Sequence, residues 1–466
     1  MTLEQKLATL PPPLRVPGAR RTLREALRAS GAKLVAIDDD PTGTQTVHDV
    51  PVLMDWSEPA LSRAFSQPEP LFFVSTNSRS LPRVEAEARA RQVGGALRAA
   101  AARGGVRLLV ASRSDSTLRG HFPAEVDALA AELPDPPDGV ILVPAFFDAG
   151  RYTIDNVHWV DTGGELIPAG ETEFAKDPDF GYAHSDLRRW VEEKTAGRIP
   201  GSHVACISIE DLRGGGQARI CAILSEARGG LPIVANAACD DDLEVLALGA
   251  QAAEERGKRF IYRTSASFVK VRAGILDKPL LTRADVMPGP RPGLIVAGSY
   301  VEKTSRQIEA LARSSSVLTL EASVPRLLDE RAAPAEITRV SAAASQGLSG
   351  GATVLLFTSR QKQPSADFLA AGRKIMDGLC QVVRGISDPP GFLVAKGGIT
   401  SLALAGSALG CQEAIVLGQI LKGVPVWRLS EGSRWKDIPY VVFPGNVGNE
   451  TALLDVVRAL GLPDRA

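Results

Sequence analysis

Short apolar runs recur along the chain and alternate with stretches in which apolar residues follow helical spacing. Consecutive aliphatic and β-branched residues predict strands that are covered on both faces of a sheet. Residues 83–104 and 303–316 lie between such runs, and their amphipathic pattern predicts helices. The runs interpreted as strands are 33–38, 71–76, 106–112, 139–144, 204–209, 293–299, 353–359, 391–396 and 440–444. The alternation of the two patterns predicts an α/β fold with mainly parallel sheets.

One segment interrupts this alternation. Residues 285–293 read DVMPGPRPG and contain three prolines and two glycines, and a predicted strand follows at once. The chain has 466 residues, which is long enough for more than one hydrophobic core. We therefore expect two α/β domains, residues 1–285 and 290–466, with an active-site cleft between them.

Bulk composition excludes several classes of partner. Lys+Arg 53 nearly balance Asp+Glu 54, so no overall field favours nucleic acid or an anionic membrane. The five cysteines have no CxxC spacing, which favours reduced thiols in a cytoplasm over a disulfide framework. The N-terminus lacks the apolar core of a signal peptide, and no apolar run approaches a membrane span. These features predict a cytoplasmic protein with a small-molecule substrate. They leave open whether it forms a homo-oligomer.

Three consecutive aspartates follow the first predicted strand. Asp38, Asp39 and Asp40 precede a Pro-Thr-Gly-Thr turn that includes Thr42. Loops at the carboxyl ends of strands are where α/β proteins bind ligands. Crowded carboxylates raise one another's proton affinity or attract a cation, and both effects suit catalysis. The cluster is therefore a candidate catalytic loop.

Two chemistries compete for this loop. In a kinase, one aspartate accepts the proton of a substrate hydroxyl that attacks a phosphoryl donor. In a haloacid-dehalogenase-type phosphatase, Asp38 would be the nucleophile and Asp40 the acid/base. The run Asp240 to Asp242 would then supply the later acidic pair that binds magnesium. The loop by itself leaves both open.

Cationic and hydroxyl side chains follow other predicted strands of the first domain. Guanidinium groups match carboxylates, and hydroxyl and carboxylate groups bind sugar hydroxyls. The candidate substrate-binding residues are Arg113, Asp115, Thr117, Arg151 and Arg263, together with Asp38 and Thr42 of the aspartate loop, and Arg119 joins Asp39 and Asp40 as a candidate catalytic residue. Together they predict a small, polyhydroxylated, anionic ligand.

Three strand-to-helix turns in the second domain combine glycine with Ser, Thr or Asn. Glycine lets backbone amides approach a ligand closely, and such turns bind anionic oxygens. The candidate nucleotide-binding residues are Ser299, Lys396, Gly397, Gly398, Thr400, Ser401, Gly445, Asn446 and Gly448. Neither a P-loop nor a dinucleotide fingerprint is present. Lys396 either reaches a phosphate or ends its strand in solvent, and the pattern does not choose between them.

Assembled in order, these motifs resemble the four-carbon acid sugar kinase family, over roughly residues 33 to 460. The resemblance rests on residues 38–43, 115–120, 144–146 with 150–151, 298–299 with Thr304 and Gln307, 397–401 and 444–448. It implies an N-terminal acid-sugar domain and a C-terminal ATP domain. Ser299, the 397–401 loop and Gly445 would contact ATP. One departure is Ile399, which stands where many members have Glu.

The resemblance also implies roles in the first domain. Asp39 or Asp40, with Asp115, Arg119 and Arg151, would hold the sugar acid or assist phosphoryl transfer. Magnesium would bridge the donor phosphates, although the sequence identifies no metal ligand. We therefore expect an ATP-dependent kinase that phosphorylates a hydroxyl of a four-carbon sugar acid, such as a tetronate or 3-oxo-tetronate.

Two rival hypotheses remain. The phosphatase explains the aspartates but leaves the second domain without a purpose. A non-catalytic sugar-acid sensor would keep the arginines but would not need the acidic triplet. The sugar acid, the hydroxyl that is phosphorylated and the aspartate that acts as base stay open.

Overall fold

The computed structural model describes residues 1–287, 289, 291–298, 302–314, 316–359, 368–445 and 447–462. The chain divides into two compact units, Met1–Thr46 with Asp55–Asp277 and Val47–Met54 with Lys278–Ala466. The main division lies after Asp277, ahead of the boundary expected at residues 285–293. The short segment 47–54 belongs to the second unit although it lies early in the chain. The predicted cleft between the domains stays a prediction.

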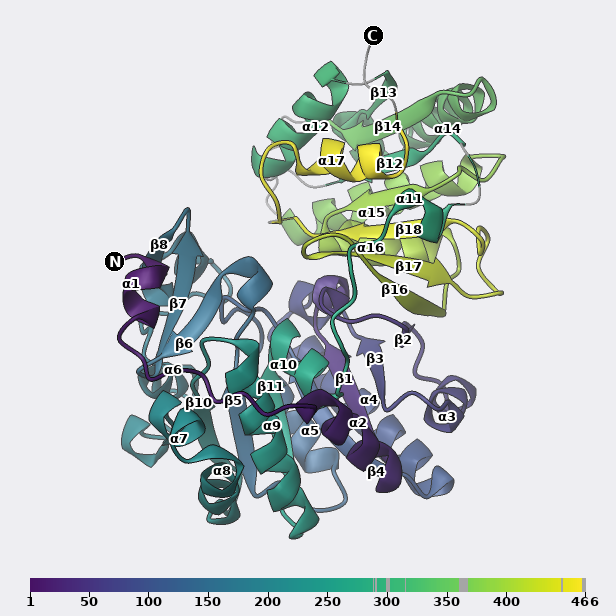
Figure 1. The fold of residues 1–466 in the computed structure, drawn as a ribbon. Coiled ribbons are helices and arrows are strands. Elements are labelled where there is room, and N and C mark those ends of the chain that lie inside the picture. The colour runs from purple at the N-terminus through teal and green to yellow at the C-terminus, as the bar shows by residue number, and fades with distance from the viewer. Residues whose placement is uncertain are drawn as a thin grey trace. The chain divides into compact units, whose positions relative to one another are not determined.

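A seven-stranded parallel sheet forms the centre of the first unit (Figure 1). In spatial order its strands are β3 (Leu71–Ser75), β1 (Ala32–Asp38), β4 (Arg107–Arg113), β11 (Phe260–Thr264), β5 (Gly139–Val143), β10 (Leu231–Ala235) and β9 (Ala205–Ile207). All seven residues of β1 are buried, as a continuous apolar run predicts. The connection after β1 leads to β3 on one side, and the next leads to β4 on the other side. The connections therefore diverge at β1.

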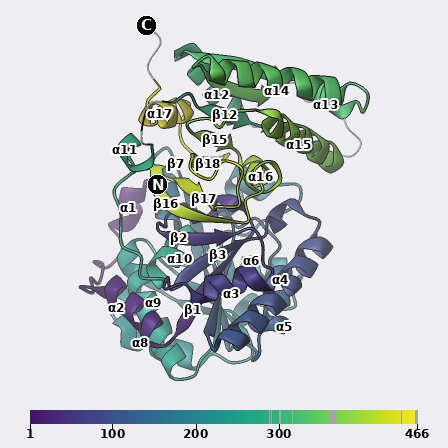
Figure 2. The ribbon, with the colours of Figure 1, turned by 90° about the vertical axis from the view of Figure 1, so that its right-hand side faces the viewer.

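Helices cover both faces of this sheet (Figure 2). One group is α3 (Glu58–Ser66), α4 (Arg83–Gly104) and α5 (Ala124–Glu132). The other is α2 (Ala19–Ala29), α8 (Gly216–Ser225), α9 (Asp240–Glu255) and α10 (Ala266–Arg272). The remaining helices are α1 (Leu3–Leu7), α6 (Leu187–Lys194) and α7 (Ile209–Arg213). The helix predicted at 83–104 is confirmed over the same residues.

A small antiparallel sheet is inserted between β5 and α6. It consists of β6 (Arg151–Ile154), β7 (Val157–Thr162) and β8 (Glu165–Pro168). Two 3₁₀ turns follow, Ala169–Glu171 and Glu173–Lys176. None of these three strands was among the predicted runs, because burial alternates along β7. The insertion carries Arg151 and Phe174 to the candidate site.

The second unit has its own mixed sheet. Its parallel strands are, in order, β13 (Val317–Ala322), β14 (Thr353–Thr358), β12 (Leu294–Ala297), β15 (Leu393–Lys396) and β18 (Pro439–Phe443). Antiparallel strands continue it as β17 (Val424–Leu429), β16 (Glu413–Leu421) and β2 (Val50–Leu53). The pairing of β2 with β16 explains why residues 47–54 belong to this unit.

A core of buried residues lies against α12 (Glu302–Ser314) and α17 (Ala452–Ala459) and includes Ile295, Val394 and Phe443. The other helices of this unit are α11 (Arg283–Val286), α13 (Val324–Leu328), α14 (Ala333–Ser349), α15 (Phe368–Gly385) and α16 (Gly398–Ala403), which continues as a π-helical turn over Leu404–Ala408. The α/β class with mainly parallel sheets is confirmed. In the described part of the chain, no helix is both long and apolar enough to cross a membrane.

Candidate active site

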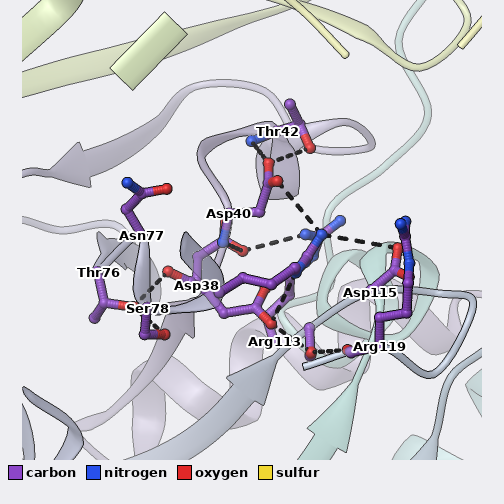
Figure 3. A network of polar contacts seen from close by, with 12 residues as sticks. Asp38, Asp40, Thr42, Thr76, Asn77, Ser78, Arg113, Asp115 and Arg119 are labelled. Carbon is purple, nitrogen blue, oxygen red and sulfur yellow. Dashed lines mark hydrogen bonds and ion pairs between the residues drawn. The ribbon is translucent and has the colours of Figure 1, made fainter. Parts of the chain in front are cut away.

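The carboxyl ends of four neighbouring strands meet at one edge of the first unit's sheet. Register pairs Asp38 with Ser75 of β3 and with Arg113 of β4, and Arg113 also pairs with Thr264 of β11. The loops that follow β1, β3 and β4 face one another there (Figure 3). This edge is the divergence point of the sheet connections, where open α/β sheets bind ligands.

Arg79 neutralises three of the crowded carboxylates. Its guanidinium donates to both carboxylate oxygens of Asp39, and its Nη1 lies 3.4 Å from Asp40 Oδ2 and 3.9 Å from Asp115 Oδ1. These negative charges raise the pKa of Arg79 against the effect of burial. The sequence motifs that predict the site do not include Arg79. The available signal was its position, directly after the predicted strand at 71–76.

Asp38 is buried and has a separate cationic partner. Its Oδ1 lies 3.2 Å from Arg113 Nη1, and Arg113 Nη2 donates to Gln45 Oε1 at 3.3 Å. Burial nevertheless raises the pKa of Asp38 to about 7, although Arg113 lowers it. Gly43 lies against the same carboxylate, since a Cβ built there would be 1.8 Å from Asp38 Oδ2.

Asp39 is also buried, and both of its oxygens are occupied. Besides Arg79, Ser114 Oγ lies 2.6 Å from Asp39 Oδ2 and accepts a hydrogen bond of 2.7 Å from Arg263 Nη2. Gly120 packs over this group with φ +120°, and a Cβ there would lie 2.9 Å from Asp39 Oδ2. Asp39 is therefore positioned by side chains from two loops, Arg79 and Ser114, and Arg263 of β11 supports Ser114.

Asp40 is the most exposed of the three aspartates. Its side chain is 21% exposed, against 3% for Asp39 and 1% for Asp38. Its Oδ1 accepts from the backbone amide of Thr42 at 2.8 Å and from Thr42 Oγ1 at 2.6 Å. Among the residues that the structure describes, its Oδ2 has only the 3.4 Å contact with Arg79. Asp40 therefore presents the most accessible carboxylate oxygen of the cluster.

Asp115, Thr117 and Arg119 form one hydrogen-bonded group after β4. Asp115 Oδ2 accepts from Arg119 Nε at 2.7 Å and from the Thr117 hydroxyl. Although burial opposes it, Arg119 and then Arg79 hold the pKa of Asp115 well below its usual range. Asp115 is thus an ionised group that orients the Arg119 guanidinium.

Arg151 contributes a second guanidinium beside Arg119. Both lie over the ring of Phe174, with distances to the ring centroid of 5.3 Å for Arg119 and 5.7 Å for Arg151. Within the described residues, the Arg151 guanidinium has neither a hydrogen bond nor an ion pair, and its Nε is buried. Burial, and secondarily the charge of Arg119, lower the pKa of Arg151. An anionic ligand would relieve this unpaired charge.

The run Asp240 to Asp242 is occupied by ion pairs at the start of α9. Asp240 Oδ2 contacts Arg20 at 2.6 Å and Lys270 at 2.8 Å. Buried Asp242 accepts from Arg213 Nε at 2.8 Å and Nη2 at 2.9 Å. Among the residues that the structure describes, no three His, Cys, Asp or Glu side chains are grouped to hold a metal ion. Asp240 and Asp242 therefore form ion pairs with residues of neighbouring helices and do not complete a phosphatase site.

In the second unit, strand register aligns the glycine turns. Ala297 pairs with Lys396, and Lys396 pairs with Phe443, so the residues that follow β12, β15 and β18 share one edge. Gly397 has φ +108° and donates its amide to Phe443 O at 2.7 Å. A Cβ on Gly298 would lie 3.0 Å from Thr400 Oγ1. The glycines thus allow close packing of neighbouring turns.

Lys396 does not end its strand in solvent. Its side chain is fully buried, and its Nζ donates to Pro444 O at 2.6 Å and lies 4.0 Å from the centroid of the Phe443 ring. Burial lowers the pKa of this amine to about 7, and nearby Lys303 adds to the effect. Lys396 therefore holds the turn that contains Gly445.

The other predicted nucleotide-binding residues differ in their surroundings. Ser401 is buried, and its hydroxyl lies 2.9 Å from Ala395 O and 2.8 Å from Gly397 O, so its proton is used within the turn. Gly398 begins α16 and precedes Ile399, whose side chain is 54% exposed. Ser299 and Asn446 lie outside the described residues.

Several side-chain oxygen atoms at this edge are buried and have no hydrogen-bond partner within the described residues. Gln307 Nε2 donates to Val447 O at 3.2 Å and Asn449 O at 2.7 Å, which fixes the turn around Gly448. Within the described part of the chain, Gln307 Oε1, Thr304 Oγ1 and Thr358 Oγ1 have no partner. Buried polar atoms are normally paired, so a polar ligand fits this edge.

Comparison with known proteins supports a sugar-binding first part and a nucleotide-binding second part of the chain. A family model described as a sugar-binding N-terminal domain matches residues 34–272, and a model described as a nucleotide-binding C-terminal domain matches residues 294–453. A D-erythronate kinase from Heliobacterium modesticaldum is 27% identical over 408 residues, covering 83% of this chain and 86% of that protein. A 3-oxo-tetronate kinase from Methylobacterium radiotolerans is 29% identical over 415 residues, covering 86% and 90%.

A solved structure has the same fold. The crystal structure of a Salmonella typhimurium LT2 protein superposes with a TM-score of 0.67 at 18% identity. The match covers 92% of this chain and 100% of that chain. The two-unit α/β architecture is therefore shared over nearly the full length of both chains.

Gly43 is expected to be irreplaceable for steric reasons. In Gly43→Ala the new methyl group would overlap the buried Asp38 carboxylate, which Arg113 holds in place. We expect a loss of about 1–3 kcal/mol in unfolding free energy, measured by urea denaturation. Gly95→Ala in α4 is the matched control, because its Cβ would meet only Glu132 Oε2 at 3.4 Å. Equal unfolding midpoints for Gly43→Ala and wild type would contradict the overlap.

Asp38 is expected to make stability depend on pH. Since its folded-state pKa of about 7 exceeds the unfolded value of about 4, its stabilising contribution is complete below pH 4 and is lost as the pH rises through 7. Asp38→Asn removes this loss. The unfolding free energy of the variant relative to wild type should therefore rise between about pH 4 and 7 and then level off. Urea denaturation across this range measures the difference, and a constant difference would refute the assignment.

Proposed function

The chain belongs to the four-carbon acid sugar kinase family, and on that premise we propose that it is an ATP-dependent kinase of a small sugar acid. The proposed acceptor is a hydroxyl of a four-carbon acid such as a tetronate or 3-oxo-tetronate. The names of the two kinases compared above support this substrate class. The family models support assigning the acid to the first unit and the nucleotide to the second.

The unpaired guanidinium of Arg151 is the observation that carries the proposal. It lies beside Arg119 over the same ring of Phe174, whereas Arg119 is held by Asp115 at its Nε and has Asp177 Oδ2 3.7 Å from its Nη1. Guanidinium groups bind carboxylates with a planar fork of donors. We assign the carboxylate of the sugar acid to these two arginines. The hydroxyls of the substrate would then lie toward the aspartates after β1.

Asp40 is the proposed general base. Asp38 and Asp39 are almost completely buried and bound by arginines, whereas Asp40 Oδ2 has one long contact, with Arg79, in the described part of the chain. The substrate hydroxyl oxygen attacks the γ-phosphorus, the bond to the β–γ bridging oxygen breaks, and Asp40 takes the hydroxyl proton. We assign Asp39 to orienting the substrate hydroxyl. We assign Arg79 to limiting the negative charge around that hydroxyl.

ATP is the proposed donor, held at the glycine turns of the second unit. Within the described residues, buried Thr304, Gln307 and Thr358 have side-chain oxygens without partners there, which fits a polar ligand. Gly298, Gly397 and Gly445 would allow its phosphates to approach the backbone. The contacts expected of Ser299 and Asn446 remain part of the proposal.

Magnesium is the proposed metal ion. It is usually bound by one or two carboxylates together with substrate phosphates, so it needs no protein cage. Both oxygens of Asp39 are occupied and Asp40 Oδ2 is assigned to the hydroxyl proton, so the donor phosphates would supply most of the ligands of the ion. When bound, the ion would neutralise charge on the donor phosphates.

The rival hypotheses lack equivalent support. A haloacid-dehalogenase-type phosphatase would need Asp38 as an exposed nucleophile, but Asp38 is 1% exposed. Its supposed magnesium ligands, Asp240 and Asp242, are occupied by arginines. A sensor without catalysis would not require the accessible carboxylate of Asp40.

Coupled measurement of ADP release tests the proposal. We expect purified protein with magnesium-ATP to form ADP only when a four-carbon sugar acid is added, across a panel of erythronate, threonate and 3-oxo-tetronate isomers. Asp40→Asn should lower kcat by about 100-fold or more, because a general base contributes roughly 10²- to 10⁴-fold. Phosphate release from sugar phosphates without ATP would instead support the phosphatase. Acid binding without turnover would support the sensor.

Arg151 is expected to govern acid affinity. Arg151→Ala should raise KM for the sugar acid by about 10- to 100-fold, since a hydrogen bond to a charged group contributes roughly 1.5–3 kcal/mol. The KM for ATP should change little. Arg188→Ala is the control, because Arg188 is an exposed arginine paired with Asp186. An unchanged acid KM in Arg151→Ala, measured from initial rates, would remove Arg151 from the substrate site.

A further inference from the structure

Glu125 is a buried acid behind the aspartate cluster. It lies in the first turn of α5 and is 6% exposed. The motifs that predict the site do not include it. Its Oε1 accepts from the Ser78 hydroxyl, and its Oε2 lies 3.8 Å from Arg263 Nη1 without a hydrogen-bond partner among the described residues. A carboxyl oxygen left unpaired in the interior requires an explanation.

Two chains of contacts connect Glu125 to the catalytic loop. In the first, Ser78 Oγ lies 3.0 Å from Thr76 Oγ1, which donates to Asp38 O at 2.9 Å. Figure 3 shows Thr76 and Ser78 together beside Asp38. In the second, Arg263 contacts Glu125 and donates through Nη2 to Ser114, which holds Asp39. Glu125 is thus connected through these contacts to the backbone of Asp38 and to the side chain of Asp39.

A small cavity is lined by both Glu125 and Asp39, with Ile37, Ala90 and Leu129 as its apolar wall. Its polar lining consists of Asp39, Thr76, Ser78, Ser112, Arg113 and Glu125. Its volume of about 10 Å³ is close to that needed by one water molecule. In the described structure, Glu125 Oε2 and Arg113 Nε are both buried without partners. One water could accept from Arg113 and bond to the carboxyl of Glu125.

We propose that Glu125 is a positioning residue for Asp39, acting through Arg263 and Ser114, and that one buried water completes this network. The inference rests on the proposed kinase function for its kinetic consequence. Glu125 itself does not touch the substrate. Its role is to keep Ser114 and Arg263 aligned so that Asp39 holds its orientation beside Asp40.

The charge state of Glu125 matters for this role. The charged groups facing it are Asp39 and Arg263, with His121 nearby, and Arg113 lines the same cavity. Burial, and then the negative charge of Asp39, raise the pKa of Glu125. When Glu125 is neutral, the positive charge of Arg263 interacts with Asp39 alone of these two acids. An ionised Glu125 would compete with Asp39 for Arg263, so kcat should fall when the pH rises through the pKa of Glu125.

A pair of substitutions separates positioning from simple packing. Glu125→Gln keeps the size and the hydrogen bonds of a neutral carboxyl, so we expect its kcat to stay within about threefold of wild type and to lose the fall that accompanies ionisation of Glu125. Glu125→Ala removes the contacts with Ser78 and the water, and should lower kcat by about tenfold or more while KM for the acid changes by less than about threefold. These ranges follow from a loss of roughly 1–3 kcal/mol for a buried partner. Glu132→Gln, in the same helix, is the matched control.

The kinetic outcomes are decisive in both directions. The inference is overturned if Glu125→Gln loses as much kcat as Glu125→Ala, or if neither variant changes kcat or its pH profile. Wild-type protein that forms no ADP with any acid would instead reject the proposed function.

Crystal structures test the positioning without turnover. We expect a water in the cavity of the wild type, and the Ser114–Asp39 contact to persist in Glu125→Gln and to be lost in Glu125→Ala. An unchanged contact in Glu125→Ala would refute the role of Glu125 whatever the activity.

Discussion

The candidate site depends on how buried guanidinium groups offset the repulsion among aspartates at one sheet edge. Asp38, Asp39 and Asp115 are nearly buried, and leaving such charges unpaired would cost several kcal/mol each. Arg79 and Arg113 supply the opposing charges from two different loops. With its neighbours neutralised in this way, Asp40 keeps an accessible carboxylate in a region that would otherwise repel it.

In both units the candidate ligand-binding residues follow the carboxyl ends of neighbouring parallel strands. Each parallel sheet has a point at which its connections diverge, and the loops there have room to bind a ligand. In the first unit these loops carry carboxylates and guanidiniums, and in the second they carry glycines and buried hydroxyl and amide oxygens. The chemistry of the two edges is therefore complementary to the two substrates that a sugar-acid kinase brings together.

Continuous apolar runs predicted β1, β3, β4, β5, β9, β12, β14, β15 and β18, because a strand covered on both faces leaves a direct trace in the sequence. The strands β10 and β11 were not predicted although nearly all of their residues are buried, and neither was β13, whose residues are mostly exposed or half-buried. The antiparallel strands β2, β16 and β17 and the inserted β6 to β8 were also missed, since burial alternates along β16 and β7 and short pieces resemble loops. The aspartates, Arg113, Asp115 and Arg119 were found by their position after strands. Arg79, Phe174 and Glu125 were missed because their contacts join segments that are far apart in the chain.

The amino-acid sequence by itself determined the α/β class, the loops that carry the polar groups and the resemblance to a kinase family, because each of these depends on local patterns. Only the tertiary structure decided which charges meet. It showed that Asp38 and Asp39 are buried, that Lys396 holds a turn and that Arg151 lacks an anionic partner within the described residues. Burial and pairing depend on neighbours contributed by other strands and loops, and no pattern along the chain records these neighbours.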